Sequence, residues 1–269
     1  MLEWIRKSYP VAVFRRFFEL ELLDRSFGLA AQAFVALLPL VILIVAVFAG
    51  SDGSVIANQL IERFGLEGAA ADAVSSLFDS PAPTFVISWT ALFITSYSAF
   101  SLSRKLSRTY GAIFQIPSLL PKQLGRGMAW VLLQVVMFAI SAGLRNLWRD
   151  SDLAVGLLAG FATFIFWLLT EYAGIRLLVP SINARLLVPA AILSSIGHMG
   201  IIVWAAVYMP RTLQTQAEQF GPIGVTFSLF TLILVGVVVM LVAPLLVGVY
   251  AQRKSAVLAN AQGPAQTGE

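Results

Sequence analysis

The chain has 269 residues, of which 58% are hydrophobic and 12% are charged, whereas soluble domains carry about 25% charged residues. This composition excludes an ordinary soluble globular domain and indicates a membrane protein. The chain contains no cysteine, which excludes disulfides, thiolate metal sites and cysteine nucleophiles.

Residues 3–24 come first in chain order and mix aromatic residues with cations. Phe14, Phe17 and Phe18 have the spacing of one helical face. We therefore predict an interfacial helix lying on the cytoplasmic leaflet. This segment is charged throughout and the apolar run after it is long enough to span a bilayer. We expect no cleavable signal peptide and a first span that stays as an anchor.

Six long apolar stretches follow the N-terminal segment. The first lies between Arg25 and Asp52, which enclose 26 uncharged residues. About 20 apolar residues are enough to cross roughly 30 Å of hydrocarbon. The sequence thus predicts an all-α polytopic membrane protein with six transmembrane helices, at about 28–49, 84–102, 127–145, 153–179, 187–208 and 223–250.

The segments between and after the spans are short, with one exception. The loop over 51–83 carries apolar residues at helical spacing, so we predict one or two short amphipathic helices covering the outer mouth of the bundle. In "RLLVPSINARLLVP", residues 176–189, "SINA" is the predicted turn between two helices. We expect one membrane domain over 1–252 and a disordered cytoplasmic tail over 253–269.

The cations are distributed unevenly between the two sides of this topology. Fourteen of the eighteen fall before the first span, after the even-numbered spans or after the last one. Cytoplasmic segments are enriched in Lys and Arg, so both termini are predicted to be cytoplasmic. The net charge of +4 then reflects the topology. Each cation near the membrane surface also contributes about 1 kcal/mol of attraction to anionic headgroups. We expect membrane lipids as partners and no nucleic acid.

Four polar residues within or near the spans form a candidate polar path: Gln32, Gln134, Glu171 and His198. His198, the only histidine, can act in a proton relay or substrate contact, or be a structural imidazole bonded to a neighbouring helix. Glu171 lies close to the cytoplasmic boundary. It can be a gate facing a polar cavity or a residue paired with Arg176 or Arg185.

Three cations end the second span in "SYSAFSLSRKLSRTYGAIF", residues 96–114. Arg104, Lys105 and Arg108 are candidate contacts for lipid headgroups, and the hydroxyl row before them, Ser98 and Ser101, is expected to pack against another helix. Pro39 and Pro244 each remove a backbone hydrogen bond inside a span, so they are candidate hinges.

Enzyme motifs are absent from the sequence. There is no Walker loop, Rossmann fingerprint, GxSxG or HExxH motif, and one histidine with few acids cannot build a two-metal site. We therefore expect neither catalysis nor a cofactor.

Four stretches carry a resemblance to a known family: "LAAQAFVALLPLVIL" at 29–43, "SYSAFSLSRKLSRTYGAIF" at 96–114, "IRLLVPSINARLLVPAAIL" at 175–193 and "FGPIGVTFSLFTLIL" at 220–234. The chain resembles the YihY/BrkB family of bacterial inner-membrane envelope proteins, formerly labelled ribonuclease BN. It departs from the family pattern at Ala190, where a glycine is usual, and at "GVYAQR". The resemblance implies six spans and a role in envelope integrity. The nuclease label does not fit a chain without a metal-ligand cluster.

Two functions follow as hypotheses. The first is a transporter or flippase for a lipid or another amphipathic envelope component. The second is a non-transporting structural protein that binds an envelope protein or a second copy of itself. The second hypothesis requires an exposed apolar patch on residues 55–79.

Overall fold

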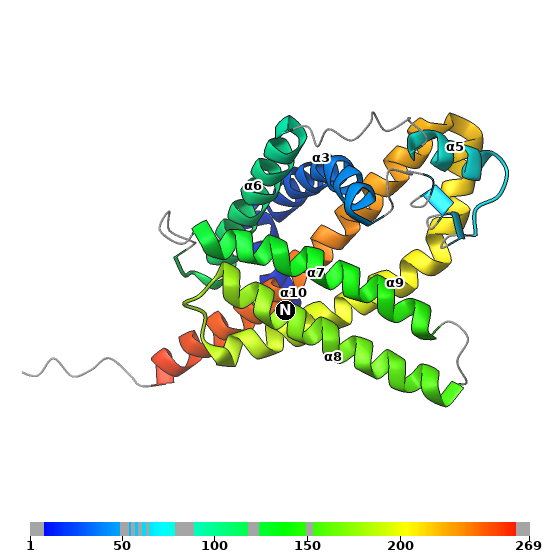
Figure 1. Ribbon diagram of the computed structural model, residues 1–269. Helices are drawn as coiled ribbons and strands as arrows, with labels where there is room; N and C mark the ends of the chain where they lie inside the picture. The colour runs from blue at the N-terminus through cyan, green and yellow to red at the C-terminus, as the bar shows by residue number, and fades with distance from the viewer. Residues whose placement is uncertain are drawn as a thin grey trace, which may run out of the picture. The chain divides into compact units, whose positions relative to one another are not determined.

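The computed structural model describes residues 8–48, 54, 57–58, 61–62, 65–78, 89–117, 124–148 and 153–261. These residues contain α-helices and no strand (Figure 1), which confirms the all-α prediction for this part of the chain. The helices are α2 (Tyr9–Glu19), α3 (Leu22–Phe48), α5 (Ala69–Phe78), α6 (Trp89–Phe114), α7 (Leu124–Trp148), α8 (Leu153–Leu178), α9 (Ala184–Phe220) and α10 (Pro222–Ala261).

Three of the described helices are long and apolar enough to cross a membrane, over Leu158–Leu178, Ala184–Phe220 and Pro222–Ser255. At most 39% of the apolar window of each is buried inside the protein. Large side chains such as Leu158, Phe161 and Val207 are mostly exposed. Exposed apolar area costs about 25 cal/mol per Å² in water and nothing comparable in lipid. These helices therefore suit a membrane environment.

The helices are longer than the spans that the sequence predicted. The described part of each predicted span lies in one helix, except that α8 ends one residue before Val179. However, α6 continues past 102 to Phe114 and α9 past 208 to Phe220. Residues such as Lys105 and Gln214 are good helix formers, so the helix continues where the apolar run stops. Hydropathy marks the apolar part of a helix and not its end.

The C-terminal segment also differs from its prediction. We expected disorder from residue 253, whereas α10 continues through Ala261. Gln252 and Arg253 each donate a hydrogen bond to a backbone carbonyl, of Ile113 and Ser8 respectively, and so tie this end of the helix down. The alanine-rich sequence after them has high helix propensity. Residues 262–269 lie outside the described residues.

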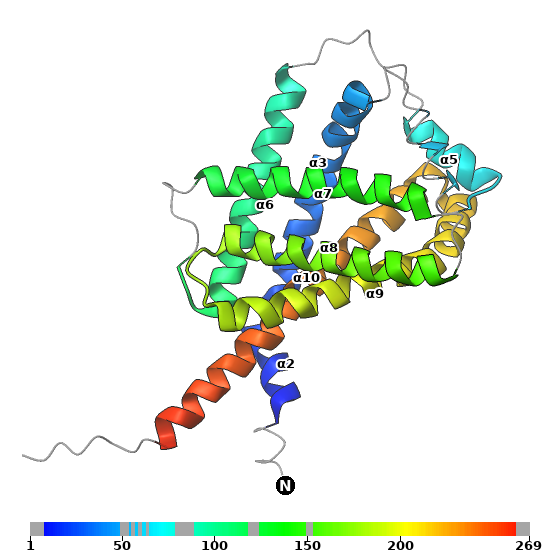
Figure 2. The ribbon, with the colours of Figure 1, turned by 60° about the horizontal axis from the view of Figure 1, so that its bottom comes forward.

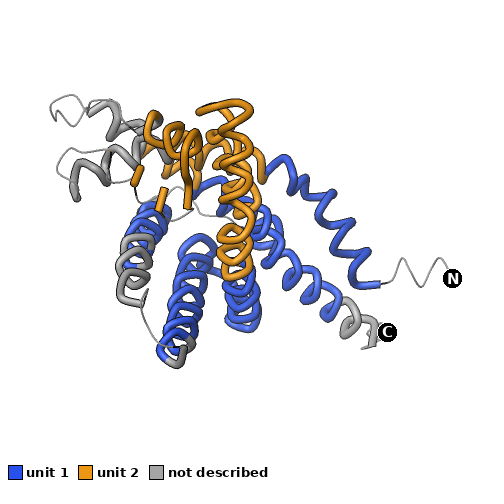
Figure 3. Tube along the Cα trace, turned by 90° about the vertical axis from the view of Figure 1, so that its right-hand side faces the viewer, with its two compact units in different colours: residues 1–25, 103–197, 238–269 blue, residues 26–102, 198–237 orange. Residues whose placement is uncertain are grey.

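The helices form two compact units (Figure 3). Unit 1 comprises residues 1–25, 103–197 and 238–269, and unit 2 comprises residues 26–102 and 198–237. Helices α3, α6, α9 and α10 each contribute residues to both units.

In unit 1, α7 packs against α8, and the two helices run side by side in Figures 1 and 2. Ser107 donates a hydrogen bond of 2.8 Å to the carbonyl of Leu178, the last residue of α8. The final carbonyls of a helix have no partner within that helix, so this contact caps α8. The turn 179–183, which contains the first three residues of the predicted "SINA" turn, then leads into α9.

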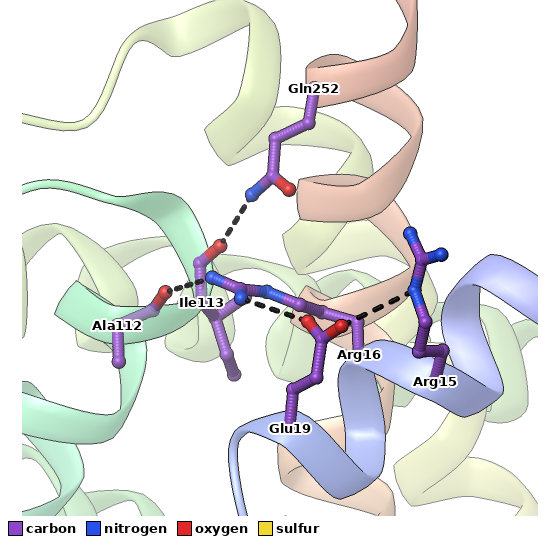
Figure 4. A network of polar contacts seen from close by, with 6 residues as sticks. All are labelled: Arg15, Arg16, Glu19, Ala112, Ile113 and Gln252. Carbon is purple, nitrogen blue, oxygen red and sulfur yellow. Dashed lines mark hydrogen bonds and ion pairs between the residues drawn. The ribbon is translucent and has the colours of Figure 1, made fainter.

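The C-terminal end of α6 is held by two side chains from distant parts of the sequence (Figure 4). Arg16 of α2 donates to the carbonyl of Ala112 at 3.5 Å, and Gln252 of α10 donates to that of Ile113 at 3.1 Å. Because the last carbonyls of α6 lack partners within the helix, these bonds satisfy them and join α2, α6 and α10.

Tyr9 makes a second connection between α2 and α10. Its hydroxyl donates to the carbonyl of Leu246 at 2.6 Å. Burial raises the pKa of the Tyr9 phenol, and the positive charge of Arg253 opposes that rise. The phenol is therefore neutral near pH 7 and keeps the proton that it donates.

Pro244 lies inside α10, which remains one continuous helix. Proline has no N–H, so the carbonyl four residues earlier, that of Met240, loses its donor within the helix. The hydroxyl of Tyr110 on α6 donates to this carbonyl at 3.4 Å. Tyr110 and Pro244 are both buried, so this side chain replaces the missing backbone donor where water has no access.

Unit 2 joins α3 to α6 through a reciprocal pair of hydrogen bonds. Gln32 donates to the carbonyl of Ser98 at 3.3 Å, and the hydroxyl of Ser98 donates to the carbonyl of Gln32 at 3.4 Å. This contact confirms that Ser98 packs against another helix. Phe34 also meets Phe230 of α10 edge to face, with ring centroids 5.9 Å apart.

The amphipathic helix predicted in the first outer loop is present as α5. Its apolar face is buried in a cluster with α9 and the start of α10, which contains Ala57, Leu66, Ala70, Ala73, Val74, Ala205, Met209, Leu213, Ala217 and Val225. The apolar side chains of this loop that the structure describes are therefore used within the protein.

The Tyr110–Met240 bond leads to a double-mutant prediction. Tyr110→Phe leaves the Met240 carbonyl unsatisfied, and we expect a loss of about 1–3 kcal/mol in unfolding free energy. In a Pro244→Ala background the helix supplies its own N–H, so the same change should cost clearly less. Thermal or denaturant unfolding of the four proteins in detergent measures this. If Tyr110→Phe lowered the unfolding free energy equally in both backgrounds, the Tyr110 hydroxyl would not be replacing the missing backbone N–H.

Candidate functional site

In unit 2 the second part of α9 and the first part of α10 form a hairpin. Helix α9 ends at Phe220, and Gly221 adopts a left-handed conformation with φ +59° before α10 begins at Pro222. Glycine takes this conformation without steric cost, and proline suits a first helical position. One turn later Gly224 faces the carbonyl of Gln216 so closely that any Cβ there would overlap it. These residues fix the distance between the two helices.

A groove of about 560 Å³ lies between the two helices of the hairpin. From α9 it is lined by a stripe at four-residue steps, which is one helical face: Trp204, Tyr208, Thr212 and Gln216, with Met209 beside it. From α10 it is lined by Phe227, Ser228, Thr231 and Val235. Its volume falls within the range of about 300–1,000 Å³ typical of ligand sites.

The groove changes from polar to apolar along its length. The polar side chains of Gln216, Thr212 and Ser228 lie towards the turn at Gly221, beside the ring of Phe227, whereas Trp204 and Val235 lie furthest from the turn along the two helices. The rings of Trp204 and Tyr208 stack, with centroids 5.1 Å apart and planes at 19°. This gradient fits a molecule with one polar and one apolar end.

The threonine and serine hydroxyls of the groove use their hydrogens within their own helices. Thr212, Ser228 and Thr231 donate to the carbonyls of Tyr208, Gly224 and Phe227, at 3.0, 2.9 and 2.9 Å. A hydroxyl has one hydrogen and two lone pairs, so each oxygen keeps acceptor capacity but has no donor left. None of the described lining residues is charged; Arg211 and Glu218 of α9 are exposed and lie outside the lining.

A second polar cluster lies in unit 1 and brings together two residues of the candidate path. Gln134 of α7 and Glu171 of α8 line a crevice with Tyr110, Trp130, Thr170, Gly174, Ile175 and Met240. The crevice has no room for a water molecule. Glu171 is buried and has an interaction partner, so it is a packed polar residue in this state and not part of an open path.

The crevice depends on the small size of Gly174. A Cβ at this position would lie 3.3 Å from Nε1 of Trp130, so the absence of a side chain lets the indole of α7 lie against α8. Glu171 and Gly174 are one turn apart on the same face of α8. The buried carboxyl of Glu171 and the indole of Trp130 therefore line the same crevice.

The other two residues of the candidate path belong to unit 2. Gln32 is bonded to Ser98 through its amide nitrogen, while its Oε1 is buried with no hydrogen-bond partner among the described residues. His198 is half-buried on α9 and has an interaction partner. Neither residue lines the hairpin groove. Gln134 and Glu171 thus meet in unit 1, whereas Gln32 and His198 belong to unit 2, and a path through all four stays a prediction.

The cations expected to meet lipid headgroups are all exposed on α6. Arg104, Lys105 and Arg108 are exposed, whereas the neighbouring Ser103, Leu106 and Ser107 are buried. This alternation gives α6 one packed face and one cationic face, as a headgroup contact requires.

Of the two candidate hinges, Pro39 and Pro244, the structure describes the side chain of Pro244 only. Helix α3 continues through Pro39, whose side chain lies outside the described residues. Pro244 is buried, and the carbonyl of Met240, which Pro244 leaves without a backbone donor, accepts a hydrogen bond from Tyr110. A protein side chain therefore satisfies this carbonyl.

The hairpin groove was missed by reasoning from the sequence alone. Its α9 stripe has a recognisable signal, because Trp204, Tyr208, Thr212 and Gln216 recur every fourth residue and grade from aromatic to polar. The α10 side has no such signal, since Thr231 and Val235 are embedded in a uniformly apolar run.

Comparison of the chain with protein-family models, curated proteins and solved structures found no match. The fold and the groove together define an α-helical protein whose three long apolar helices suit a membrane.

The close approach at Gly224 gives a prediction with an internal control. Gly224→Ala should lower the melting temperature and open the hairpin, because the added Cβ collides with the Gln216 backbone. Gly236→Ala on the same helix meets nothing within 4 Å and should be neutral or stabilising, since alanine is the better helix former. Thermal unfolding in detergent compares the two. Equal melting temperatures for both variants would show that the two helices can separate at Gly224 without loss of stability.

Proposed function

We propose that the protein is an integral inner-membrane protein of the bacterial envelope, with six spans and both termini in the cytoplasm, that binds and moves a lipid or another amphipathic envelope component. The observation that carries this proposal is the hairpin groove, whose polar and apolar ends match the two ends of an amphiphile.

The exposed surface supports placing this groove within reach of lipid. Phe227, a groove residue on α10, is 66% exposed, as is Phe161 on α8. A groove that opens beside lipid-facing side chains can receive an amphiphile directly from the bilayer. The amphiphile's tail then exchanges one apolar environment for another, at little cost in transfer free energy.

The distribution of cations supports the orientation. The exposed Arg104, Lys105 and Arg108 lie on the side predicted to be cytoplasmic, where anionic headgroups attract them. The α9–α10 turn then lies on the outer side, so the polar end of the groove faces outward. Such an orientation suits release of a headgroup to the outer leaflet.

The resemblance to the YihY/BrkB family is part of this proposal. One of its four stretches, "FGPIGVTFSLFTLIL", contains the hairpin turn and most of the α10 side of the groove. The residues that carry the resemblance are thus also residues that shape the groove.

The alternative is a structural protein without transport that docks another protein on its outer loop. It requires an exposed apolar patch on residues 55–79. Ala70, Ala73 and Val74 in this segment are instead buried against α9. This burial favours the first proposal.

Movement of lipid across a bilayer tests the proposal directly. In liposomes containing the purified protein and a fluorescent phospholipid, the label should cross faster than in protein-free liposomes. Thr231→Trp fills the groove and should return the rate to the protein-free value. Thr226→Trp, one turn nearer the hairpin turn, half-buried and outside the groove lining, should leave the rate unchanged. An identical rate with and without protein would overturn the proposal.

The absence of cysteine makes the topology testable with single substitutions. In spheroplasts, a membrane-impermeant maleimide should label Gln219→Cys at the hairpin. It should label Ser255→Cys only after the membrane is permeabilised, because that position is predicted to be cytoplasmic. Labelling of both positions in intact spheroplasts, or of position 255 alone, would contradict the assigned orientation.

A further inference from the structure

Helix α2 carries an exposed apolar side formed by Val11, Phe14 and Phe18. We propose that this side binds the boundary between headgroups and acyl chains of an anionic leaflet, and that the lipid contact keeps α2 docked on α6 and α10. The sequence predicted only a helix on the membrane surface. The proposal adds which side of the helix meets lipid and which contacts within the protein depend on it.

The inward side of α2 is held mainly by polar contacts. Tyr9 donates to the carbonyl of Leu246 on α10 at 2.6 Å. Arg16 donates to the carbonyl of Ala112 on α6 at 3.5 Å (Figure 4). Ala12 is buried, and its spacing from Tyr9 and Arg16 is that of one helical face. The protein thus holds α2 through hydrogen bonds and one small side chain, and not through the large apolar residues of the helix.

The outward side of α2 is apolar and exposed. Val11, Phe14 and Phe18 each follow an inward residue by two positions, which is about 200° around a helix of 3.6 residues per turn. Phe14 and Phe18 are 66% and 56% exposed, and their ring centroids lie 4.7 Å apart. A helix packed in water turns its apolar side towards the core, so α2 has the reverse arrangement. This arrangement requires an apolar phase outside the protein.

Two hydrogen bonds place α2 at one end of the apolar run of α10, a helix long enough to span a membrane. Tyr9 donates to the carbonyl of Leu246, and Arg253 donates to the carbonyl of Ser8. Between these two contacts α10 changes from apolar to charged, and Tyr250 on this stretch is exposed. Tyrosine is enriched at membrane–water interfaces, and Lys and Arg follow the ends of spans. The contacts therefore hold α2 at the depth of the interface.

The size and charge of the outward side fit lipid better than a second copy of the protein. Stable protein interfaces bury roughly 800 Å² on each partner, and three side chains on a helix of 11 residues offer far less. Arg15 follows Phe14 directly and is exposed, in an ion pair with Glu19. An arginine beside an apolar side lays its stem along acyl chains and its charged group among phosphates. An anionic leaflet supplies both.

The depth of position 14 in the membrane tests the lipid contact. Because the chain has no cysteine, Phe14→Cys and Glu19→Cys each accept a single NBD fluorophore. The full-length protein is reconstituted in anionic liposomes that contain a lipid with a nitroxide either near the headgroup or deep in the acyl chain. We expect severalfold stronger quenching at position 14 than at position 19. The shallow nitroxide should quench more than the deep one, since an interfacial helix lies about 5–10 Å into the boundary.

The other outcomes overturn the lipid contact. Equally weak quenching at both positions would place the outward side in water. Stronger quenching by the deep nitroxide would place it in the hydrocarbon core. Oxidation of unlabelled Phe14→Cys to cross-linked dimers, with the fluorophore shielded from both nitroxides, would show that a second copy of the chain covers this side.

Thermal unfolding in nanodiscs of the same lipid tests whether docking depends on the lipid contact. Phe14→Gln with Phe18→Gln removes the apolar side and should lower the melting temperature by several degrees. The matched control, Phe14→Leu with Phe18→Leu, keeps an apolar side and should melt as the wild type does. Tyr9→Phe removes the donor to α10. It should lower the melting temperature clearly in the wild-type background and little in the glutamine background, where α2 is already undocked.

An equal effect of Tyr9→Phe in both backgrounds would show that docking of α2 does not depend on lipid, and would overturn the second half of the proposal. The groove residues belong to unit 2, whereas α2 and its contacts belong to unit 1. Failure of either test therefore leaves the proposed function as it stands.

Discussion

The fold depends on satisfying backbone hydrogen bonds where water is excluded. A helix can leave its last carbonyls, or a carbonyl opposite a proline, unpaired only where water or a side chain replaces the donor. In unit 1 the replacement donors are side chains: Tyr110 serves the carbonyl orphaned by Pro244, Ser107 serves the end of α8, and Arg16 serves the end of α6. Each contact joins helices far apart in sequence, so the constraint on the backbone also determines which helices meet.

The same constraint explains the chemistry of the hairpin groove. Threonine and serine hydroxyls within a helix donate to the carbonyl four residues earlier, because that acceptor is always within reach. In the groove this leaves the oxygens of Thr212, Ser228 and Thr231 with acceptor capacity only, whereas the side chains of Gln216, Trp204 and Tyr208 can donate. The lining therefore offers both donors and acceptors.

The sequence predicted the all-α class, the amphipathic helices α2 and α5, and the packing of Ser98, because these follow from local spacing and composition. It did not predict the ends of α6, α9 and α10, which continue beyond the apolar runs. It placed Gln32, Gln134, Glu171 and His198 on one candidate path; Gln134 and Glu171 share a crevice in unit 1, and Gln32 and His198 belong to unit 2. The groove was missed because it depends on how closely Gly224 lets α10 approach α9, a distance that no periodicity records.

The central claim is that the groove between α9 and α10 holds an amphiphile inside a membrane. An experimental structure of the full chain in a lipid nanodisc tests it most directly. The account predicts elongated density between the Trp204–Tyr208 stack and Thr231, with its narrow end towards Val235 and its head near Gln216. A groove closed by the two helices, or filled by side chains of the protein itself, would contradict the account.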